Sequence, residues 1–490
     1  MRIPLLPLAT LTLALFAATA IADVTLPKVI GDNMVLQQGK PVPIWGHAAA
    51  GEPVTVQFAD QTKTAKADGD GNWRVTLDAL AASDQPRAMT ISGGNKINLS
   101  NILVGEVWFC SGQSNMEFTM AHNASFKAPK SGPDILSGDL AAAGEPSAYA
   151  AIRLFRVEKA LPKDDVKSTG WGLCNTANLA PFSAAAFYFG KELHETLHVP
   201  VGLVESSWGG QPVERFTPLS AYAGNAEFQV STTRPAAPTL DGQHVGDIYQ
   251  YMIQPLIPYA IRGAIWYQGE SNLIDGDAGP RYTDKMTAMI NAWRAAWNEG
   301  DFSFYQVQLA PYYYTKRKDH VAHPPEALAE YWEAQAAVLK LPNTGLAATI
   351  DISEDPANIH PPDKWDVGHR LALLAMRHDY GKSDTVDGGP MFKSVEVQGN
   401  KMRLTFSNIG GGLVSADAQQ LREFEIAGSD GSFVSAGAEI YGDTIVVSST
   451  QVTSPVAVRY AWHETPKTNL ANKDGLPAFP FRTEVRPQNP

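Results

Sequence analysis

The amino-acid sequence predicts an α/β protein in which a doubly wound parallel sheet is flanked by an N-terminal and a C-terminal β domain. Over 23–101, apolar and polar residues alternate in short runs separated by Gly, Asp and Pro, which is typical of a small β-sandwich. Over 102–385, apolar strands alternate with helical segments, which indicates parallel strands joined by helices. Short alternating strands return over 386–490 and predict a second β domain, or strands that rejoin the first.

The central segment is expected to contain five strands and four long helices. Five apolar runs are expected as strands, over 103–109, 201–206, 263–267, 302–309 and 344–350. Four longer segments are expected as helices, over 184–198, 281–297, 326–340 and 367–378. A chain of 490 residues also exceeds what one hydrophobic core usually supports, so more than one domain is expected.

The first residues, 1–22, predict a signal peptide. Arg2 precedes an apolar stretch over 5–16, and the small-residue pattern Ala20-Ile21-Ala22 follows it. Prolines and threonines interrupt the stretch, which is shorter than the roughly 20 residues that a membrane span needs. We therefore expect a periplasmic or secreted protein without a membrane span.

Charge and cysteine content argue against several functions. The chain has 39 Lys and Arg against 51 Asp and Glu, a net charge of −12, and it has no basic run. Nucleic acid and anionic membranes are therefore not expected partners. Cys110 and Cys174 are too few for a disulfide scaffold or a thiolate metal site, and a single disulfide and two buried thiols are equally expected for them.

Four loops of unusual composition follow the predicted strands. They cover 110–116, 206–210, 268–272 and 360–362. Ligands and catalytic groups gather past the carboxyl ends of the strands in a doubly wound sheet. The four loops are therefore expected to converge on one site.

The first and last of these loops carry a candidate nucleophile and a candidate base. Ser114 follows a strand and a glycine and should open a helix, which would expose its hydroxyl. His360 precedes two prolines that stiffen its loop, and the helix that follows, with Lys364 on its first turn, would hold it in place. Alone, Ser114 would more often be a helix cap and His360 a surface histidine. Met116 replaces the final glycine of the Gly-x-Ser-x-Gly elbow, which argues against the ordinary α/β-hydrolase fold.

The two middle loops carry candidate oxyanion donors. Gly209 or Gly210 could present a backbone N–H to a substrate oxygen, and Gln268 offers a side-chain amide. Taken singly, the paired glycines would more often form a tight turn, and Gln268 would bond to backbone at a strand end.

A competing pattern is the HETLH sequence over 194–198, which fits the H-E-x-x-H zinc motif. The predicted helix ends at once, because Val199-Pro200 begins the next strand. No third ligand follows, and both histidines would lie at the end of the strand–helix unit away from the expected site. A chance match is the better interpretation, so no metal is expected.

Three motifs in order resemble the sialate O-acetylesterase family, which belongs to the wider SGNH hydrolases. They are GQSNM over 112–116, WYQGESN over 266–272, and IHP over 359–361 followed by VGHRLA over 367–372. Shorter matches at MVLQ, 34–37, and VRYAW, 458–462, extend the resemblance over nearly the whole mature chain. The resemblance implies an SGNH hydrolase domain over 102–385.

The resemblance also implies roles for individual residues. Ser114 would be the nucleophile and His360 its base. The oxyanion donors would be Ser114, Gly209 or Gly210, and Gln268, and Glu270 and Asn272 would support the site through hydrogen bonds.

The sequence does not decide which residue orients the imidazole of His360. Family members usually carry an aspartate two residues before the histidine, where this chain has Asn358. Asp355 is the first candidate for the third catalytic residue and Asp351 the second. Alternatively, Asn358 or a backbone carbonyl orients the imidazole.

The function expected from the resemblance is release of acetate from acetylated sugars, without a metal or an organic cofactor. The expected substrates are sialic acid O-acetyl esters or acetylated hemicellulose such as xylan or xyloglucan. The alternative is a noncatalytic carbohydrate-binding protein with a decayed esterase site.

Overall fold

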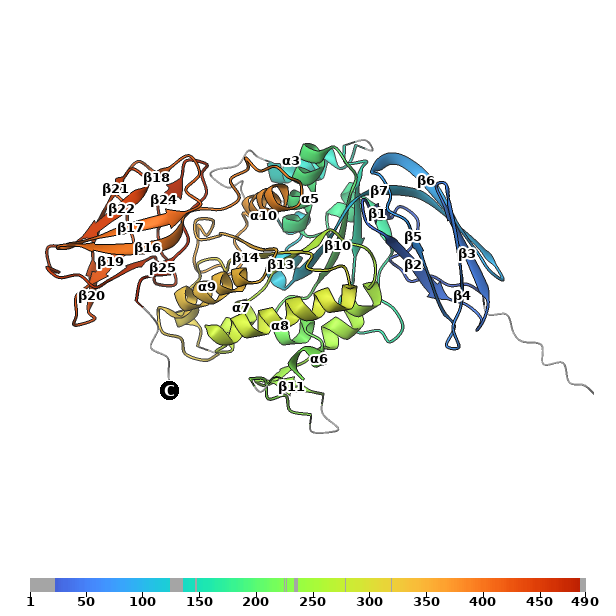
Figure 1. Ribbon diagram of the computed structural model, residues 1–490, viewed down its shortest axis with the longest axis horizontal. Coiled ribbons are helices and arrows are strands. Elements are labelled where there is room, and N and C mark those ends of the chain that lie inside the picture. The colour runs from blue at the N-terminus through green and yellow to red at the C-terminus, as the bar shows by residue number, and fades with distance from the viewer. Residues whose placement is uncertain are drawn as a thin grey trace, which may run out of the picture.

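The structure is a computed structural model that describes residues 23–123, 135–145, 148–223, 225, 227–232, 237–277, 279–318 and 320–484. The expected signal peptide, 1–22, lies outside these residues. Three regions follow one another along the long axis of the molecule (Figure 1): N-terminal strands at one end, a sheet covered by helices in the middle, and C-terminal strands at the other end. None of the helices in the described part of the chain combines the length and the apolar character that a bilayer crossing needs.

The central sheet has the strand order β15-β14-β13-β7-β10-β8-β9. Its strands are β7 (Lys96–Gly112), β8 (Ile152–Arg156), β9 (Trp171–Leu173), β10 (Val201–Ser207), β13 (Gly263–Tyr267), β14 (Ser303–Val307) and β15 (Thr344–Ala347). All neighbours are parallel except β9, which is antiparallel to β8. The five expected strands are confirmed, and β8 and β9 are additions that the sequence analysis missed.

Strand β7 lies at the point where the winding of the sheet reverses. From β7 the chain builds β8 and β10 on one side, and then β13, β14 and β15 on the other. Gly112, at the end of β7, is in register with Ser207 of β10 and with Tyr267 of β13. The loops that leave these three strands therefore start side by side, at the place where open α/β sheets bind ligands.

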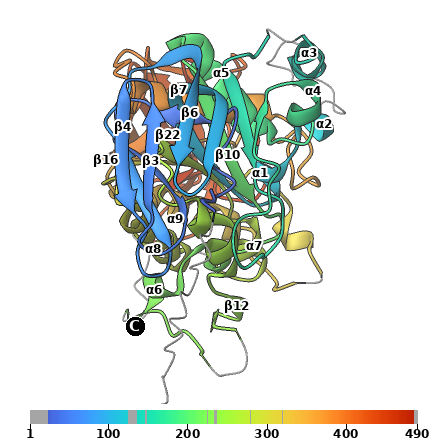
Figure 2. The same cartoon turned by 90° about the vertical axis from the view of Figure 1, so that its right-hand side faces the viewer.

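Helices cover both faces of the sheet (Figures 1 and 2). The long ones are α5 (Ala184–Leu197), α8 (Pro280–Trp297), α9 (Ala327–Ala337) and α10 (Lys364–His378), which confirms the four expected helices. Shorter helices are α1 (Ser114–Glu117), α2 (Met120–Asn123), α3 (Ile135–Ala142), α4 (Thr176–Leu179), α6 (Leu219–Tyr222) and α7 (Glu270–Ile274). Helix α10 begins three residues before its expected start because the Asp363 side chain accepts a hydrogen bond from the N–H of Asp366 and caps the helix.

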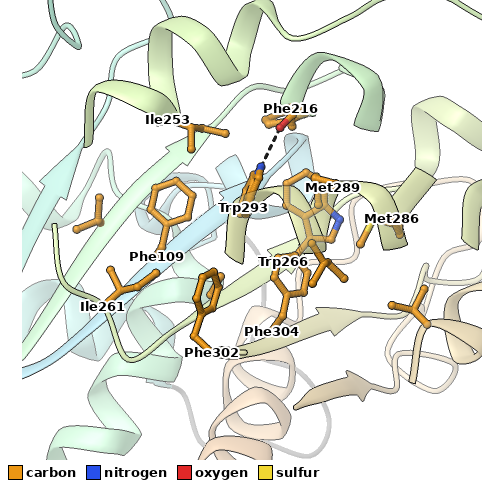
Figure 3. Close-up of a cluster of buried hydrophobic side chains, with 14 of the residues drawn as sticks. Phe109, Phe216, Ile253, Ile261, Trp266, Met286, Met289, Trp293, Phe302 and Phe304 are labelled. Carbon is orange, nitrogen blue, oxygen red and sulfur yellow. Dashed lines mark hydrogen bonds between the residues drawn. The ribbon is translucent and has the colours of Figure 1, made fainter. Parts of the chain in front are cut away.

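The two faces of β7 bury alternate side chains. Trp108 and Cys110 pack in the core that contains α5 and α10. Phe109 points to the opposite core, beneath α8, where Trp293 packs edge-on against it with ring centroids 5.5 Å apart. The indole N–H of Trp293 donates to the carbonyl of Phe216, 3.0 Å away (Figure 3). Packing on both faces fixes the strand that carries the candidate nucleophile.

The N-terminal strands are continuous with the central sheet. They are β1 (Val35–Gln37), β2 (Val42–His47), β3 (Pro53–Phe58), β4 (Gln61–Lys66), β5 (Asn72–Leu77) and β6 (Ser83–Ser92). Strand β6 pairs with the first part of β7, and β1 pairs with β7 at Leu103. The expected boundary between 101 and 102 therefore falls inside one uninterrupted strand, and the exact domain limits stay predictions.

The C-terminal strands form their own sheets. One has the order β16-β17-β22-β21 and another β20-β19-β23-β25, with β18 paired to β24. Their bounds are β16 (Met391–Gln398), β17 (Lys401–Ser407), β18 (Leu413–Ser415), β19 (Phe424–Ala427), β20 (Phe433–Ser435), β21 (Gly437–Tyr441), β22 (Thr444–Ser448), β23 (Ala457–Tyr460), β24 (Leu470–Asn472) and β25 (Phe481–Arg482). Within the described part of the chain they pair only with one another, so they do not rejoin the N-terminal sheet. The predicted fold class, an α/β sheet between two β regions, is confirmed.

Candidate active site

The turn between β7 and α1 places Ser114 at the carboxyl edge of the sheet. Gly112 has a φ of +144°, and a Cβ at this position would lie 2.2 Å from the carbonyl oxygen of Tyr267 in β13, so only glycine fits. The next residue, Gln113, donates its N–H to the same carbonyl at 2.9 Å. Ser114 then opens α1, where the first N–H groups of a helix have no partner within the helix. Its N–H is therefore available to a substrate.

Ser114 and His360 meet although they lie 246 residues apart in the chain. The distance from His360 Nε2 to Ser114 Oγ is 2.8 Å. This is within the range over which a histidine accepts the proton of a nucleophilic hydroxyl. The structure thus brings together the two residues predicted to carry the chemistry.

Two buried side chains hold the loop that carries His360. Asn115 Nδ2 donates to the carbonyl of Ile359 at 3.1 Å. Lys364 Nζ donates to the carbonyl of Pro361 at 2.7 Å and to Asn115 Oδ1 at 2.6 Å. The backbone is therefore bonded immediately before and immediately after His360. We call Asn115 and Lys364 the loop clamp.

Glu270 supports the loop clamp through a hydrogen bond with Asn115. Its Oε1 accepts a hydrogen bond from Asn115 Nδ2 at 2.5 Å, and the carboxyl is fully buried, which raises its pKa. Burial also lowers the pKa of Lys364 to about 7, although nearby Glu270 acts against the shift. The predicted supporting role of Glu270 thus corresponds to a contact with the residue next to Ser114.

The structure does not bring Asp355 to His360. The Asp355 side chain is exposed, and its Oδ1 accepts a hydrogen bond from the N–H of Ala357 at 2.9 Å. This local turn holds the carboxylate in its own loop. The expectation that Asp355 is the third catalytic residue thus has no support in the geometry.

The other candidates for this role are also engaged elsewhere. Asp351 forms a two-point ion pair with Arg370, at 2.7 and 2.8 Å. Asn358 Oδ1 accepts from the backbone N–H of His360 at 2.9 Å, so it orients the loop and not the ring. Among the described residues, the ring of His360 is hydrogen-bonded to Ser114 through Nε2, and Nδ1 has no hydrogen-bond partner.

The surroundings of His360 oppose a positive charge on its ring. Burial is the largest cause, followed by the charge of Lys364 and that of His122, and together they lower the pKa of His360 to about 4. The imidazole is therefore neutral near pH 7 and ready to accept a proton.

The two glycines after β10 differ in their hydrogen bonds. The N–H of Gly209 donates to Glu117 Oε2 at 2.7 Å. Gly209 also lies against the nucleophile, because a Cβ on it would be 3.2 Å from Ser114 Cβ. Gly210 has a φ of +72°, and no described residue accepts from its N–H. Of the two predicted donors, Gly210 is thus the one whose N–H is not taken up by a described residue.

Gln268 is buried and its amide N–H groups are occupied. Gln268 Nε2 donates to Asn272 Oδ1 at 2.7 Å and to the carbonyl of Gln211 at 3.2 Å. Asn272 Oδ1 also accepts from the N–H of Val213 at 2.9 Å. Both side chains thus tie the loop after β10 to the loop after β13. The expected direct donation from Gln268 to an oxyanion would need these bonds to rearrange.

The sequence analysis missed Glu117 and its partner Lys159. Glu117 Oε1 lies 2.5 Å from Lys159 Nζ, while its other oxygen holds Gly209. The position of Glu117, three residues after Ser114 on one helix, is a signal that could have found it. Nothing in the sequence places Lys159 beside it.

The histidines of the HETLH sequence lie away from the candidate site. His194 Nδ1 lies 2.7 Å from the carbonyl of Val199, and α5 ends where β10 begins, at the edge of the sheet opposite Ser114. No cluster of three or more metal-binding side chains occurs in the described part of the chain.

Cys110 and Cys174 are buried free thiols, which decides between the disulfide and the two buried thiols that the sequence left open.

Comparison with known proteins decides the family. The family model described as "Carbohydrate esterase, sialic acid-specific acetylesterase" matches residues 104–377, more than half of the chain. The chain belongs to this family. The predicted resemblance is confirmed, and the protein is an ester hydrolase of the carbohydrate esterase type.

Individual relatives cover almost the whole chain. The sialate O-acetylesterases of Homo sapiens and Pongo abelii are each 28% identical over 519 residues, which span 94% of this chain and 92% of theirs. The crystal structure of a carbohydrate acetylesterase from Xanthomonas citri superposes with a TM-score of 0.82 at 36% identity. It covers 95% of this chain and 100% of its own. The family likeness therefore extends to both flanking β regions.

Proposed function

We propose that this carbohydrate esterase removes acetyl groups from O-acetylated sugars, with Ser114 as nucleophile and His360 as general base. The observation that carries the proposal is the 2.8 Å contact between His360 Nε2 and Ser114 Oγ. The relatives named as sialate O-acetylesterases and carbohydrate acetylesterase support the choice of an acetyl ester.

The reaction proceeds in two displacements. His360 Nε2 takes the hydroxyl proton as Ser114 Oγ attacks the acetyl carbonyl, and the N–H groups of Ser114 and Gly210 bind the oxyanion. When the C–O bond to the sugar breaks, His360 returns the proton to the departing oxygen. Water then gives its proton to the same nitrogen and attacks the acetyl-enzyme, which releases acetate and restores Ser114. This sequence requires no metal ion and no organic cofactor.

The low pKa of His360 shapes the energetics of each displacement. With its pKa near 4, the imidazole is a weak base, and the imidazolium formed during attack is unstable in its surroundings. The proton is therefore held only briefly and is passed on to the leaving oxygen. Stabilisation of the transition state then depends largely on the oxyanion donors.

The proposed substrates fall into two classes that differ in charge. Sialic acid O-acetyl esters are anionic, while acetylated xylan and xyloglucan are neutral. The net charge of −12 disfavours an anionic sugar, and the half-exposed Lys159 and Arg156 near the carboxyl edge are each paired with a carboxylate, Glu117 and Glu205. A periplasmic or extracellular location, as the expected signal peptide implies, would bring the enzyme to either class.

The test is acetate release from both substrate classes by the purified protein, with Ser114→Ala measured in parallel. Release that falls at least about 10³-fold in Ser114→Ala and survives EDTA supports the proposal. Release that persists in Ser114→Ala contradicts the serine mechanism. Sugar binding without acetate release would favour the noncatalytic alternative.

A further inference from the structure

We propose that Glu117 is a positioning residue that locks the turn after β10 so that Gly210, and not Gly209, presents the oxyanion donor. The inference rests on the proposed function and deepens it. Its basis is a contact between two loops that both belong to the site: the carboxylate of Glu117 accepts the N–H of Gly209 at 2.7 Å.

The contact ties the donor turn to the nucleophile through one short helix. Glu117 is the last residue of α1, and Ser114 is the first. The turn is also held at its start, because the N–H of Trp208 donates to the carbonyl of Gly112 at 3.0 Å. With Trp208 and Gly209 both bonded to the segment that carries Ser114, the next N–H, that of Gly210, is fixed relative to Ser114.

Geometry leaves little freedom for any other arrangement. Gly209 packs so closely on α1 that a Cβ would lie 2.8 Å from Glu117 Oε2 and 3.2 Å from Ser114 Cβ. Its N–H is occupied by a charged acceptor, which makes a stronger hydrogen bond than a neutral one. An acyl oxygen would have to displace this carboxylate to reach Gly209, whereas Gly210 has no such competitor among the described residues.

A carboxylate beside an oxyanion site needs a counter-charge. The negative charge of Glu117 would repel the negative charge that develops on the acyl oxygen. Lys159 Nζ, 2.5 Å from Glu117 Oε1, offsets that charge. Lys159 also holds the Glu117 carboxylate through this ion pair, so that part of its contribution should disappear when Glu117 carries no charge.

The experiment uses the full-length protein and two readouts. The first is kcat and KM for acetate release. The second is the rate at which an aryl phosphonate modifies Ser114, followed by intact mass, because this reaction needs the oxyanion donors but no sugar. In Glu117→Ala we expect both kcat and the phosphonylation rate to fall about 10–10²-fold, with KM within about twofold. Glu117→Gln keeps an acceptor for Gly209 and should recover about tenfold of that loss.

The double-mutant cycle isolates the charge. Lys159→Met should lower kcat about three- to tenfold in the wild-type background and have a smaller effect in Glu117→Gln, where the ion pair is already absent. The control is Glu299→Ala, which breaks a 3.0 Å ion pair with Lys40 away from the site and should leave both rates unchanged. Thermal unfolding of each variant tests whether the fold is retained.

Separate outcomes overturn the inference and the proposed function. Phosphonylation of Ser114 that is equally fast in wild type and Glu117→Ala would overturn the positioning role. A rise in KM with unchanged kcat would show that Glu117 binds substrate instead. Faster phosphonylation in Glu117→Ala would show that the carboxylate blocks the site. If the wild type is phosphonylated at Ser114 but releases no acetate, the proposed substrate fails while the positioning role is still decided by the phosphonate rates.

Discussion

The low pKa of His360 leads us to predict that the enzyme keeps its activity at acidic pH. A histidine with an ordinary pKa near 6.5 is about 3% neutral at pH 5, whereas one with a pKa of about 4 is about 90% neutral. The enzyme should therefore keep nearly full kcat/KM at pH 5, where an ordinary histidine base would lose about thirtyfold. Because kcat/KM reports groups of the free enzyme, its acid limb should lie near pH 4.

Lys364→Met tests the physical cause of the shift. Burial, the largest cause, stays in the variant, but the charge of Lys364 is lost. A nearby positive charge disfavours imidazolium, so its removal raises the pKa of His360 and moves the acid limb to higher pH, between 4 and 6.5. The plateau of kcat also falls, because the hydrogen bond to the carbonyl of Pro361 is lost.

The assay is kcat/KM between pH 3.5 and 8 with a soluble acetylated sugar, and the position of the limb is the readout. Lys393→Met, an exposed lysine on β16, serves as the control and should leave the limb in place. A wild-type limb between pH 6 and 7, or the same limb in Lys364→Met, would refute the reasoning. Stability should change in the same window: the unfolded chain binds more protons at His360, so the unfolding free energy falls as pH drops from about 6.5 to 4.

Three further substitutions test other parts of the structure. Gly209→Ala places a methyl group 3.2 Å from Ser114 Cβ, so kcat should fall about 10–10²-fold while circular dichroism shows an intact fold. Asp355→Ala should change kcat/KM by less than about threefold, because the carboxylate bonds to its own loop; a loss near 10⁴-fold would restore it to the triad. Lys285→Met removes a buried ammonium within 2.6 Å of Glu214 Oε1 and 2.5 Å of Asp277 Oδ2. Urea unfolding should show a loss of about 3–5 kcal/mol, and an unchanged midpoint would contradict the buried pairing.

Apolar runs were sufficient to predict five of the seven strands of the central sheet. The five expected strands are long apolar runs, and parallel strands buried on both faces have this composition. Strand β8 was missed because it is short and carries Arg153 and Arg156 among its five residues. Arg153 is nevertheless buried, and its guanidinium donates to Asn101 Oδ1 at 3.5 Å, a partner 52 residues away that only the tertiary structure reveals.

The candidate site likewise contains residues that the sequence could predict and residues that it could not. Ser114 and His360 were predictable because the ends of parallel strands meet at one edge, whatever their separation in the chain. Asp355 was chosen because it is close to His360 in the sequence. In a loop, however, closeness in sequence does not fix the direction in which a side chain points. The hydrogen bond from Ala357 shows that local turn geometry determined the outcome. Glu117 and Lys159 meet only through tertiary structure, so periodicity alone could not pair them.

The loop clamp explains how a histidine without a carboxylate partner can serve as a base. In a Ser-His-Asp triad the aspartate both fixes the ring and stabilises its positive charge. Here the first task is divided between Asn115 and Lys364, which bond the backbone on either side of His360. The second task has no counterpart among the described residues, because the nearest buried charge, Lys364, acts in the opposite direction. The stabilisation that the imidazolium lacks must then come from the oxyanion donors. This division predicts that loss of Glu117 costs more activity than loss of Asp355, the reverse of the order that a conventional triad would give.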